Sequence, residues 1–149
     1  MSKVEIPEGY KELSFNQPHI ETLGPGYYKR EGNNLYMAFY VKPENCNGYG
    51  TAHGGVLMAL ADFTMASSAM KDRNSLVTTV SFHSEFIAPA EKDSLLIIRA
   101  TPTKVGKSLG FVEGDIKVEE KVIIGQHKEA YQKVWICQKR VWHRTVFWL

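Results

Sequence analysis

The sequence predicts an α+β domain in which an antiparallel sheet curves around one long helix. The segment from Gly54 to about Lys71 has the length of a helix, and its apolar residues occur on every side, which is typical of a buried element. Two aromatic-rich runs precede it, and four strand-like stretches with short turns between them follow it. Strands joined by short turns pair antiparallel, and such a sheet can cover most sides of a single helix.

The individual elements are expected in the following order. Residues 1–26 form a polar arm that prolines and glycines interrupt, with space for a short helix. Tyr27–Glu31 and Leu35–Lys42 flank a Gly-Asn turn, which predicts a β-hairpin. A loop rich in Asn and Gly leads from there to the helix. The four strands after the helix are expected at Leu76–Ala88, Ser94–Val105, Leu109–Glu119 and Val122–Ile136.

Length and composition limit the class of protein. The 149 residues are enough for one domain with a full core and few for two, so residues 1–149 are taken as a single domain. A net charge of +2 predicts no nucleic-acid partner. Cys46 and Cys137 are far apart and predict neither a metal site nor a disulfide framework. The longest apolar run is too short for a membrane span and the N-terminus too polar for a secretory signal, so a cytoplasmic protein is expected.

The last residues, 135–149, form an atypical tail in which aromatic and basic side chains alternate. This pattern is compatible with contact to nucleic acid or to a membrane. The preferred interpretation is a segment that packs over the sheet or over a neighbouring subunit, and neither nucleic acid nor a membrane is expected as a partner.

Asp62 is the residue of the predicted helix that most needs an explanation. It is the only ionisable side chain between His53 and Lys71. Burial of an unpaired carboxylate costs several kcal/mol, so a buried Asp62 requires a partner. It is either a core group satisfied by hydroxyls such as those of Thr64 or Thr79, or a functional acid, because an acid in an apolar pocket is a candidate catalytic group.

The segment Asn47–Gly55, with the sequence NGYGTAHGG, is followed by Leu60-Ala61-Asp62, and together they resemble the signature of hotdog-fold acyl-CoA thioesterases of the PaaI-like branch. Val77–Val80, Phe86–Ala90 and Gly106–Val112 are similar to later segments of that family, and the resemblance spans about residues 35–133. It implies a hotdog fold, in which a curved antiparallel sheet wraps one long helix. It also implies a homodimer, expected to pair into a dimer of dimers, that hydrolyses acyl-CoA between subunits without a metal or other cofactor.

The resemblance also implies roles for five catalytic residues. Asp62 matches the catalytic carboxylate, which acts as a general base or as a nucleophile. Gly54 matches the residue whose backbone N–H polarises the thioester carbonyl. Asn47 and His53 match polar residues beside the carbonyl or the water, and Thr79 matches a hydroxyl that helps to hold the water. Structural roles stay open for three of them: Asn47 in an Asn-Gly turn, His53 as a helix cap and Thr79 as a strand residue.

Six further residues are predicted to contact the substrate. Two apolar side chains would help to line the part of the site that receives the acyl group, and one glycine lies at the expected helix start. The other three belong to the hairpin that lies near the coenzyme A phosphates in the family. The alternatives are core packing for the apolar side chains and solvation for the turn lysines. The six are Gly55, Met58, Phe82, Lys104, Lys107 and Ser108.

The physical chemistry of the helix supports part of this assignment independently. Gly54 is expected at the helix N-terminus, where unpaired N–H groups and the helix dipole favour a developing oxyanion. At 1.5 Å per residue, Gly54 and Asp62 are about 12 Å apart along one helix. That is too far for both to act on one thioester carbon. If both act, Asp62 must therefore come from the neighbouring subunit.

Two other functions remain open for the sequence. One is a non-catalytic acyl-CoA-binding hotdog module, although no effector segment is visible. The other is a hotdog dehydratase or hydratase, which usually pairs a histidine with an acid in a different sequence context. The acyl group is also open: aryl-acetyl, hydroxybenzoyl and medium-chain fatty acyl thioesters all remain candidates.

Overall fold

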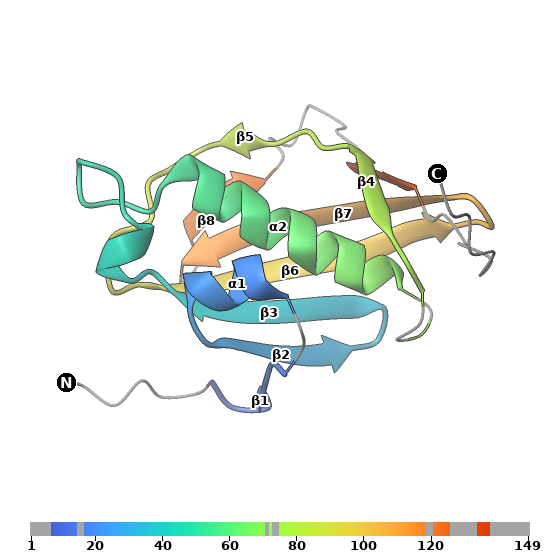
Figure 1. Ribbon diagram of the computed structural model, residues 1–149, viewed down its shortest axis with the longest axis horizontal. Helices are drawn as coiled ribbons and strands as arrows, with labels where there is room; N and C mark the ends of the chain where they lie inside the picture. Colours follow the sequence, from blue (N-terminus) through green and yellow to red (C-terminus); the bar gives the residue numbers. More distant parts are fainter. Residues whose placement is uncertain are drawn as a thin grey trace, which may run out of the picture.

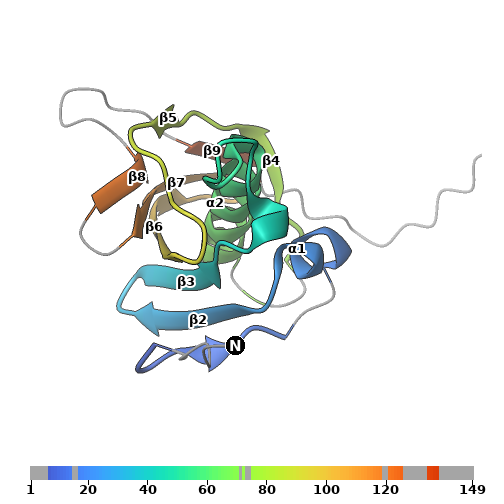
Figure 2. The same cartoon turned by 90° about the vertical axis from the view of Figure 1, so that its left-hand side faces the viewer.

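A computed structural model of the chain describes residues 7–14, 17–70, 72, 75–118, 121–125 and 134–137. One antiparallel sheet curves around the helix α2, Gly54–Ala69, which lies across its concave face (Figure 1). Figure 2 shows α2 nearly end-on, with the sheet on several of its sides. This arrangement confirms the predicted α+β hotdog architecture.

The sheet is built mainly from antiparallel neighbours along the chain. Its order is β1-β2-β3-β6-β7-β8-β5, while β9 pairs with β4 and β7. The N-terminal arm contributes β1 and the short helix α1, Pro18–Leu23, and a 3-10 turn, Pro43–Asn45, follows β3. The strands are β1 Lys11–Glu12, β2 Gly26–Glu31, β3 Asn34–Tyr40, β4 Thr78–Ser81, β5 Glu85–Phe86, β6 Leu95–Val105, β7 Leu109–Val118, β8 Lys121–Gly125 and β9 Val134–Cys137.

The core lies between α2 and the concave face of the sheet. On α2, Leu57, Leu60 and Thr64 face the sheet and are buried. Alternate residues of the central strands, such as Phe39 of β3 and Ile98 of β6, meet them. This alternation with a period of two is what a sheet with one covered face requires. On the opposite side of α2, the described residues leave Gly55 and Met58 exposed.

The predicted hairpins and helix agree with the structure. The β2–β3 hairpin turns at Gly32-Asn33, and Gly32 has a positive φ of 56°, which glycine adopts without strain. The helix starts at Gly54 as predicted and ends at Ala69, two residues earlier than expected.

The strand predicted at Leu76–Ala88 is wrong as a single element, because the structure forms β4 and β5 with a break between them. Pairing shifts register between Thr79 and Ser81, and Phe82 then packs against both core clusters. Anchoring one aromatic ring in the core interrupts the strand. For the stretch Val122–Ile136, β8 and β9 occupy the two ends, and residues 126–133 lie outside the described part. The same holds for residues 138–149 of the predicted tail, whose residues 135–137 belong to β9.

Candidate active site

The loop before α2 is organised by the side chain of Asn47. Its Oδ1 accepts hydrogen bonds from the backbone N–H groups of Tyr49 at 2.9 Å and of Thr51 at 3.3 Å. Its Nδ2 donates to the Thr51 hydroxyl at 3.0 Å. Two backbone hydrogen bonds, from Asn47 to Thr51 and from Gly50 to Asn47, close the same loop. Asn47 therefore has the structural role of a turn residue, and its contact with a substrate stays a prediction.

His53 is the N-cap of α2. Its Nδ1 accepts a hydrogen bond from the backbone N–H of Gly55 at 2.9 Å, which satisfies one of the unpaired amides of the first turn. Because Nδ1 is the acceptor, the proton of the neutral ring is on Nε2. The side chain is exposed, so the Nε2–H group is accessible as a donor beside the helix start. His53 is therefore confirmed as the cap of the helix, and its participation in catalysis remains a prediction.

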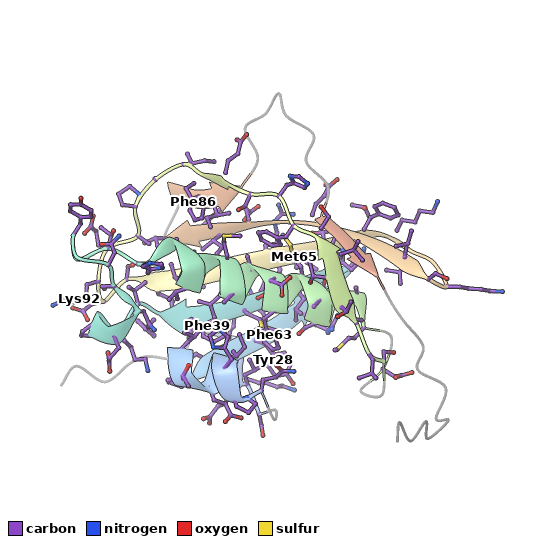
Figure 3. The ribbon with its side chains drawn as sticks, turned by 45° about the horizontal axis from the view of Figure 1, so that its top comes forward. Tyr28, Phe39, Phe63, Met65, Phe86 and Lys92 are labelled. Carbon is purple, nitrogen blue, oxygen red and sulfur yellow. The ribbon has the colours of Figure 1, made fainter. Side chains whose placement is uncertain are left out.

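Gly54 provides an amide that is unpaired at the positive end of the helix. It is the first residue of α2, and its N–H has no hydrogen-bond partner among the described residues. It borders a hollow whose wall includes Asn47, Leu57 and the segment Phe86–Pro89. A Cβ at Gly54 would lie 3.3 Å from the ring of Phe86, labelled in Figure 3. Glycine therefore leaves room for another group to approach this amide.

Asp62 lies on α2 about two turns beyond Gly54 and is oriented by one hydroxyl. Thr79 of β4 donates a hydrogen bond from Oγ1 to Oδ1 of Asp62 at 2.5 Å. The other candidate partner, Thr64, donates to the carbonyl of Leu60 instead. Oδ2 of Asp62 has no partner within the part of the chain that the structure describes. The hydrogen bond thus fixes the carboxylate and leaves Oδ2 as a proton acceptor or nucleophile.

We expected α2 to be buried on all sides, with Asp62 inside the core. In the single chain this expectation is wrong. Asp62 is half-buried, and Gly55 and Met58 on the neighbouring surface of α2 are exposed. The sheet covers one side of α2, yet the other side is also apolar. Counting apolar residues does not distinguish a face covered by the chain's own sheet from a face that is left open.

The structure divides the remaining predicted contact residues into separate regions. Lys104, Lys107 and Ser108 are exposed in the β6–β7 hairpin, which Figure 1 shows near the C-terminal end of α2, away from the loop before the helix. One chain therefore does not bring them to Gly54. Phe82 packs against both core clusters, as its alternative interpretation predicted, and it does not border the hollow beside Gly54.

The segment Phe86–Pro89 is the part of the hollow that sequence reasoning did not assign to the site. Phe86 and Ile87 are both exposed, at 55% and 42%, although they are consecutive apolar residues. In a half-buried strand two neighbours point to opposite faces, so two exposed apolar neighbours mark an unusual position. In the sequence, two consecutive large apolar residues directly before Ala88-Pro89 were the feature that could have indicated this part of the site.

Comparisons with known proteins identify the family of the chain. Residues 49–124, just over half of the chain, match the model of the family described as thioesterase superfamily. A Pseudomonas aeruginosa protein named "Putative esterase PA0474" is 26% identical over 123 residues, which are 80% of this chain and 92% of that protein.

Solved structures share the fold at low identity. The Escherichia coli PaaI protein from the phenylacetic acid degradation operon gives a TM-score of 0.70 at 18% identity, over 83% of this chain and 86% of that one. A thioesterase from Haemophilus influenzae gives 0.69 at 18% identity, over 85% and 87% of the two chains.

The curved antiparallel sheet around one long helix is a hotdog fold, and the family match identifies a thioester hydrolase with that fold. The chain belongs to the thioesterase superfamily, as the match over residues 49–124 shows. Within the described residues, no helix is long and apolar enough to cross a membrane. The expectation of a reaction without metal or other cofactor stays a prediction.

Proposed function

We propose that the protein hydrolyses acyl-CoA thioesters to the free acid and coenzyme A, in a site that two subunits share. The observation that carries this proposal is the pair of groups on α2: the unpaired amide of Gly54 and the carboxylate of Asp62, oriented by Thr79. The first can stabilise an oxyanion and the second can activate or replace a water nucleophile.

The chemistry follows from these two groups. Oδ2 of Asp62 takes a proton from water while the water oxygen bonds to the thioester carbon, or Oδ2 attacks that carbon itself. The carbonyl oxygen becomes an oxyanion and accepts a hydrogen bond from the Gly54 N–H. When this intermediate collapses, the carbon–sulfur bond breaks, and the thiolate of coenzyme A leaves and takes up a proton. The first route gives the free acid directly, whereas the second leaves an acyl anhydride on Asp62, which a water then hydrolyses to the free acid and the restored carboxylate.

The second subunit is required by the spacing of these groups and supported by an open apolar edge. Gly54 and Asp62 are about 12 Å apart along α2, so one chain cannot direct both at one carbon. Leu76, just before β4, and Val80 of β4 are 60% and 61% exposed, and Phe86 of β5, a strand that pairs on one side only among the described residues, is 55% exposed. An exposed apolar sheet edge is a template for pairing with another chain.

In such a pair, each site combines Gly54 of one chain with Asp62 of the other. The chain that supplies Asp62 would then also supply Lys104 and Lys107 of its β6–β7 hairpin, and these lysines would contact the coenzyme A phosphates. Dimers of dimers and a cytoplasmic location remain part of the proposal. Because the solved structures share so little sequence identity with this chain, their similarity supports the fold alone. It does not indicate which acyl group is hydrolysed.

Replacement of Asp62 tests the proposal directly. Asp62→Asn keeps the size of the side chain but removes its basicity, so kcat for release of coenzyme A should fall on the order of 10²-fold or more. The release is measured with a thiol reagent on aryl-acetyl, hydroxybenzoyl and medium-chain acyl thioesters. Asp93→Asn, at an exposed position where a φ of 66° suits asparagine, is the matched control. Near wild-type kcat in Asp62→Asn would show that this carboxylate is not catalytic.

A further inference from the structure

A second hollow borders α2 on the side away from β4, and the reaction described above does not use it. It lies between the second half of α2, the β2–β3 hairpin and the segment before α1. Most of its wall is apolar, and Figure 3 labels two of the aromatic side chains, Tyr28 and Phe63. The apolar lining residues are Leu13, Tyr28, Leu35, Met37, Phe63 and Met70.

The hollow exists because α1 is short. On β2, Tyr28 and Arg30 pair with the core residues Met37 and Leu35 of β3, so their side chains stand on the face of the sheet that faces α2. The six-residue helix α1 packs into the core through Ile20 and covers only part of that face. Beyond α1, no residue that the structure describes fills the space between the inner face of the hairpin and the last turns of α2.

Arg30 is an exposed cation at the rim of this hollow. Its Nη2 donates to the carbonyl of Ser67 at 3.3 Å, in the last turn of α2, where carbonyl groups lack helical partners. The other N–H groups of the guanidinium have no partner among the described residues. The hydroxyl of Ser67, also in the lining, likewise has none there. A guanidinium with free N–H groups matches the geometry of a carboxylate.

The hollow is close to the proposed catalytic carboxylate. Asp62 and Phe63 are consecutive, so their side chains leave α2 about 100° apart, given 3.6 residues per turn. On the helix surface between these two directions lie Ala59 and Ala66, which are half-exposed and small. An extended chain can therefore cross α2 from Asp62 to the hollow without meeting a bulky side chain.

We propose that this hollow receives the distal part of the acyl group and that Arg30 selects acyl groups ending in a carboxylate. The inference rests on the proposed acyl-CoA hydrolysis and names the substrate class of that site. The apolar wall binds the methylene chain or ring, and the guanidinium and the Ser67 hydroxyl bind the terminal carboxylate. Glu12, an exposed acid in the same lining, opposes this preference by repulsion.

The first test compares octanoyl-CoA with suberoyl-CoA, which have the same number of carbons and differ in the terminal carboxylate. We expect kcat/KM to favour suberoyl-CoA by on the order of tenfold or more, because charged hydrogen bonds in a partly apolar site discriminate strongly. Arg30→Met should abolish the preference, and Arg30→Lys should retain part of it. Lys117→Met, on the outer face of β7, is the matched control and should keep the full preference.

Two further measurements separate this inference from the proposed function. Glu12→Gln should strengthen the preference for suberoyl-CoA, and ligand-observed NMR should detect free suberate binding to the wild type but not to folded Arg30→Met. Hydrolysis of octanoyl-CoA with no preference for suberoyl-CoA, or a preference that survives Arg30→Met, would overturn the inference and leave the proposed function in place. Absence of coenzyme A release from every thioester would instead overturn the proposed function.

Discussion

Tyr10 shows how one side chain of the N-terminal arm is tied to the sheet. Its ring lies over the ammonium group of Lys29, with Nζ 5.0 Å from the ring centre. Burial raises the pKa of Tyr10 to about 12, and the charges of Glu31 and Tyr36 add to the shift. The neutral phenol is therefore the form that the folded arm favours.

This shift predicts how docking of the arm depends on pH. Because the folded pKa lies above the ordinary value of 10.0, the stabilisation is complete below pH 10 and is lost as the pH rises through about 12. The test is a pH titration of the wild type and of Tyr10→Phe, followed by absorbance at the tyrosinate band. The difference between the two curves should show one tyrosine that ionises near pH 12. A difference spectrum that titrates at the ordinary tyrosine pKa would show that the arm does not enclose Tyr10.

Gly54 allows a direct test of a backbone amide in catalysis. Proline fits the first position of a helix, and His53 has the extended backbone that a residue before proline requires, with φ −63° and ψ 134°. Gly54→Pro therefore keeps the helix but removes the N–H group. We expect kcat to fall roughly 10²–10³-fold, the loss seen when one oxyanion donor is removed.

Gly54→Ala is the control for this change. Its Cβ approaches the Phe86 ring to 3.3 Å, a contact that a small shift of the exposed ring relieves, and the amide is retained. Activity close to that of the wild type is expected. Equal losses in Gly54→Pro and Gly54→Ala would mean that space, and not the amide, limits the reaction.

Sequence reasoning identified the residues of the motif but not the contacts that they make. Asn47 and His53 are where the motif predicts them, yet their hydrogen bonds serve the loop and the helix start. Asn and His can bind either a substrate or the backbone, and residue type does not decide between these. The partner of Asp62, by contrast, was among the two hydroxyls that the sequence offered.

At the level of elements, β6 and β7 approach so closely that one position between them admits only glycine. A Cβ at Gly114 of β7 would lie 2.2 Å from the carbonyl oxygen of Arg99 and 2.8 Å from the Cε of Met65 on α2. The backbone oxygen cannot move aside without breaking the pairing of the two strands.

Gly114→Ala should therefore destabilise the fold. We expect a loss of roughly 1–3 kcal/mol in the free energy of unfolding, as for overpacked core positions, measured by denaturant titration. Gly48→Ala is the matched control, because nothing lies within 4 Å of a Cβ there. A Gly114→Ala variant as stable as Gly48→Ala would contradict the close approach of these strands.

Elements with local signals were predictable, and those set by packing were not. The start of α2 at Gly54 and the β2–β3 hairpin follow from glycine positions and from the pattern of apolar residues. The break between β4 and β5 does not, because it arises where Phe82 enters the core between distant segments.

For the molecule as a whole, the shared site predicts complementation between two inactive chains. Gly54→Pro and Asp62→Asn each disable both sites of their own dimer. In a hybrid dimer, one site combines the intact Gly54 of one chain with the intact Asp62 of the other. Random mixing should therefore restore about a quarter of the wild-type activity, since half of the dimers are hybrids with one good site each.

The measurement requires unfolding and refolding the two variants together, with size-exclusion chromatography to confirm that dimers form. Each variant refolded alone is the control and should stay inactive. Well-formed hybrids that recover no activity would contradict a site that combines Gly54 of one chain with Asp62 of the other.

The sequence by itself indicated the family through the resemblance of the motif Asn47–Gly55 and Asp62. It also determined the α+β architecture and the positions of Gly54 and Asp62 on one helix, because these depend on local spacing and on the pattern of apolar residues. Tertiary structure decided which side of α2 the sheet covers, that Thr79 orients Asp62, and that an open hollow lies beside Arg30. These features depend on which distant segments pack together. Apolar residues look alike in a sequence whether the sheet, a ligand or another subunit covers them.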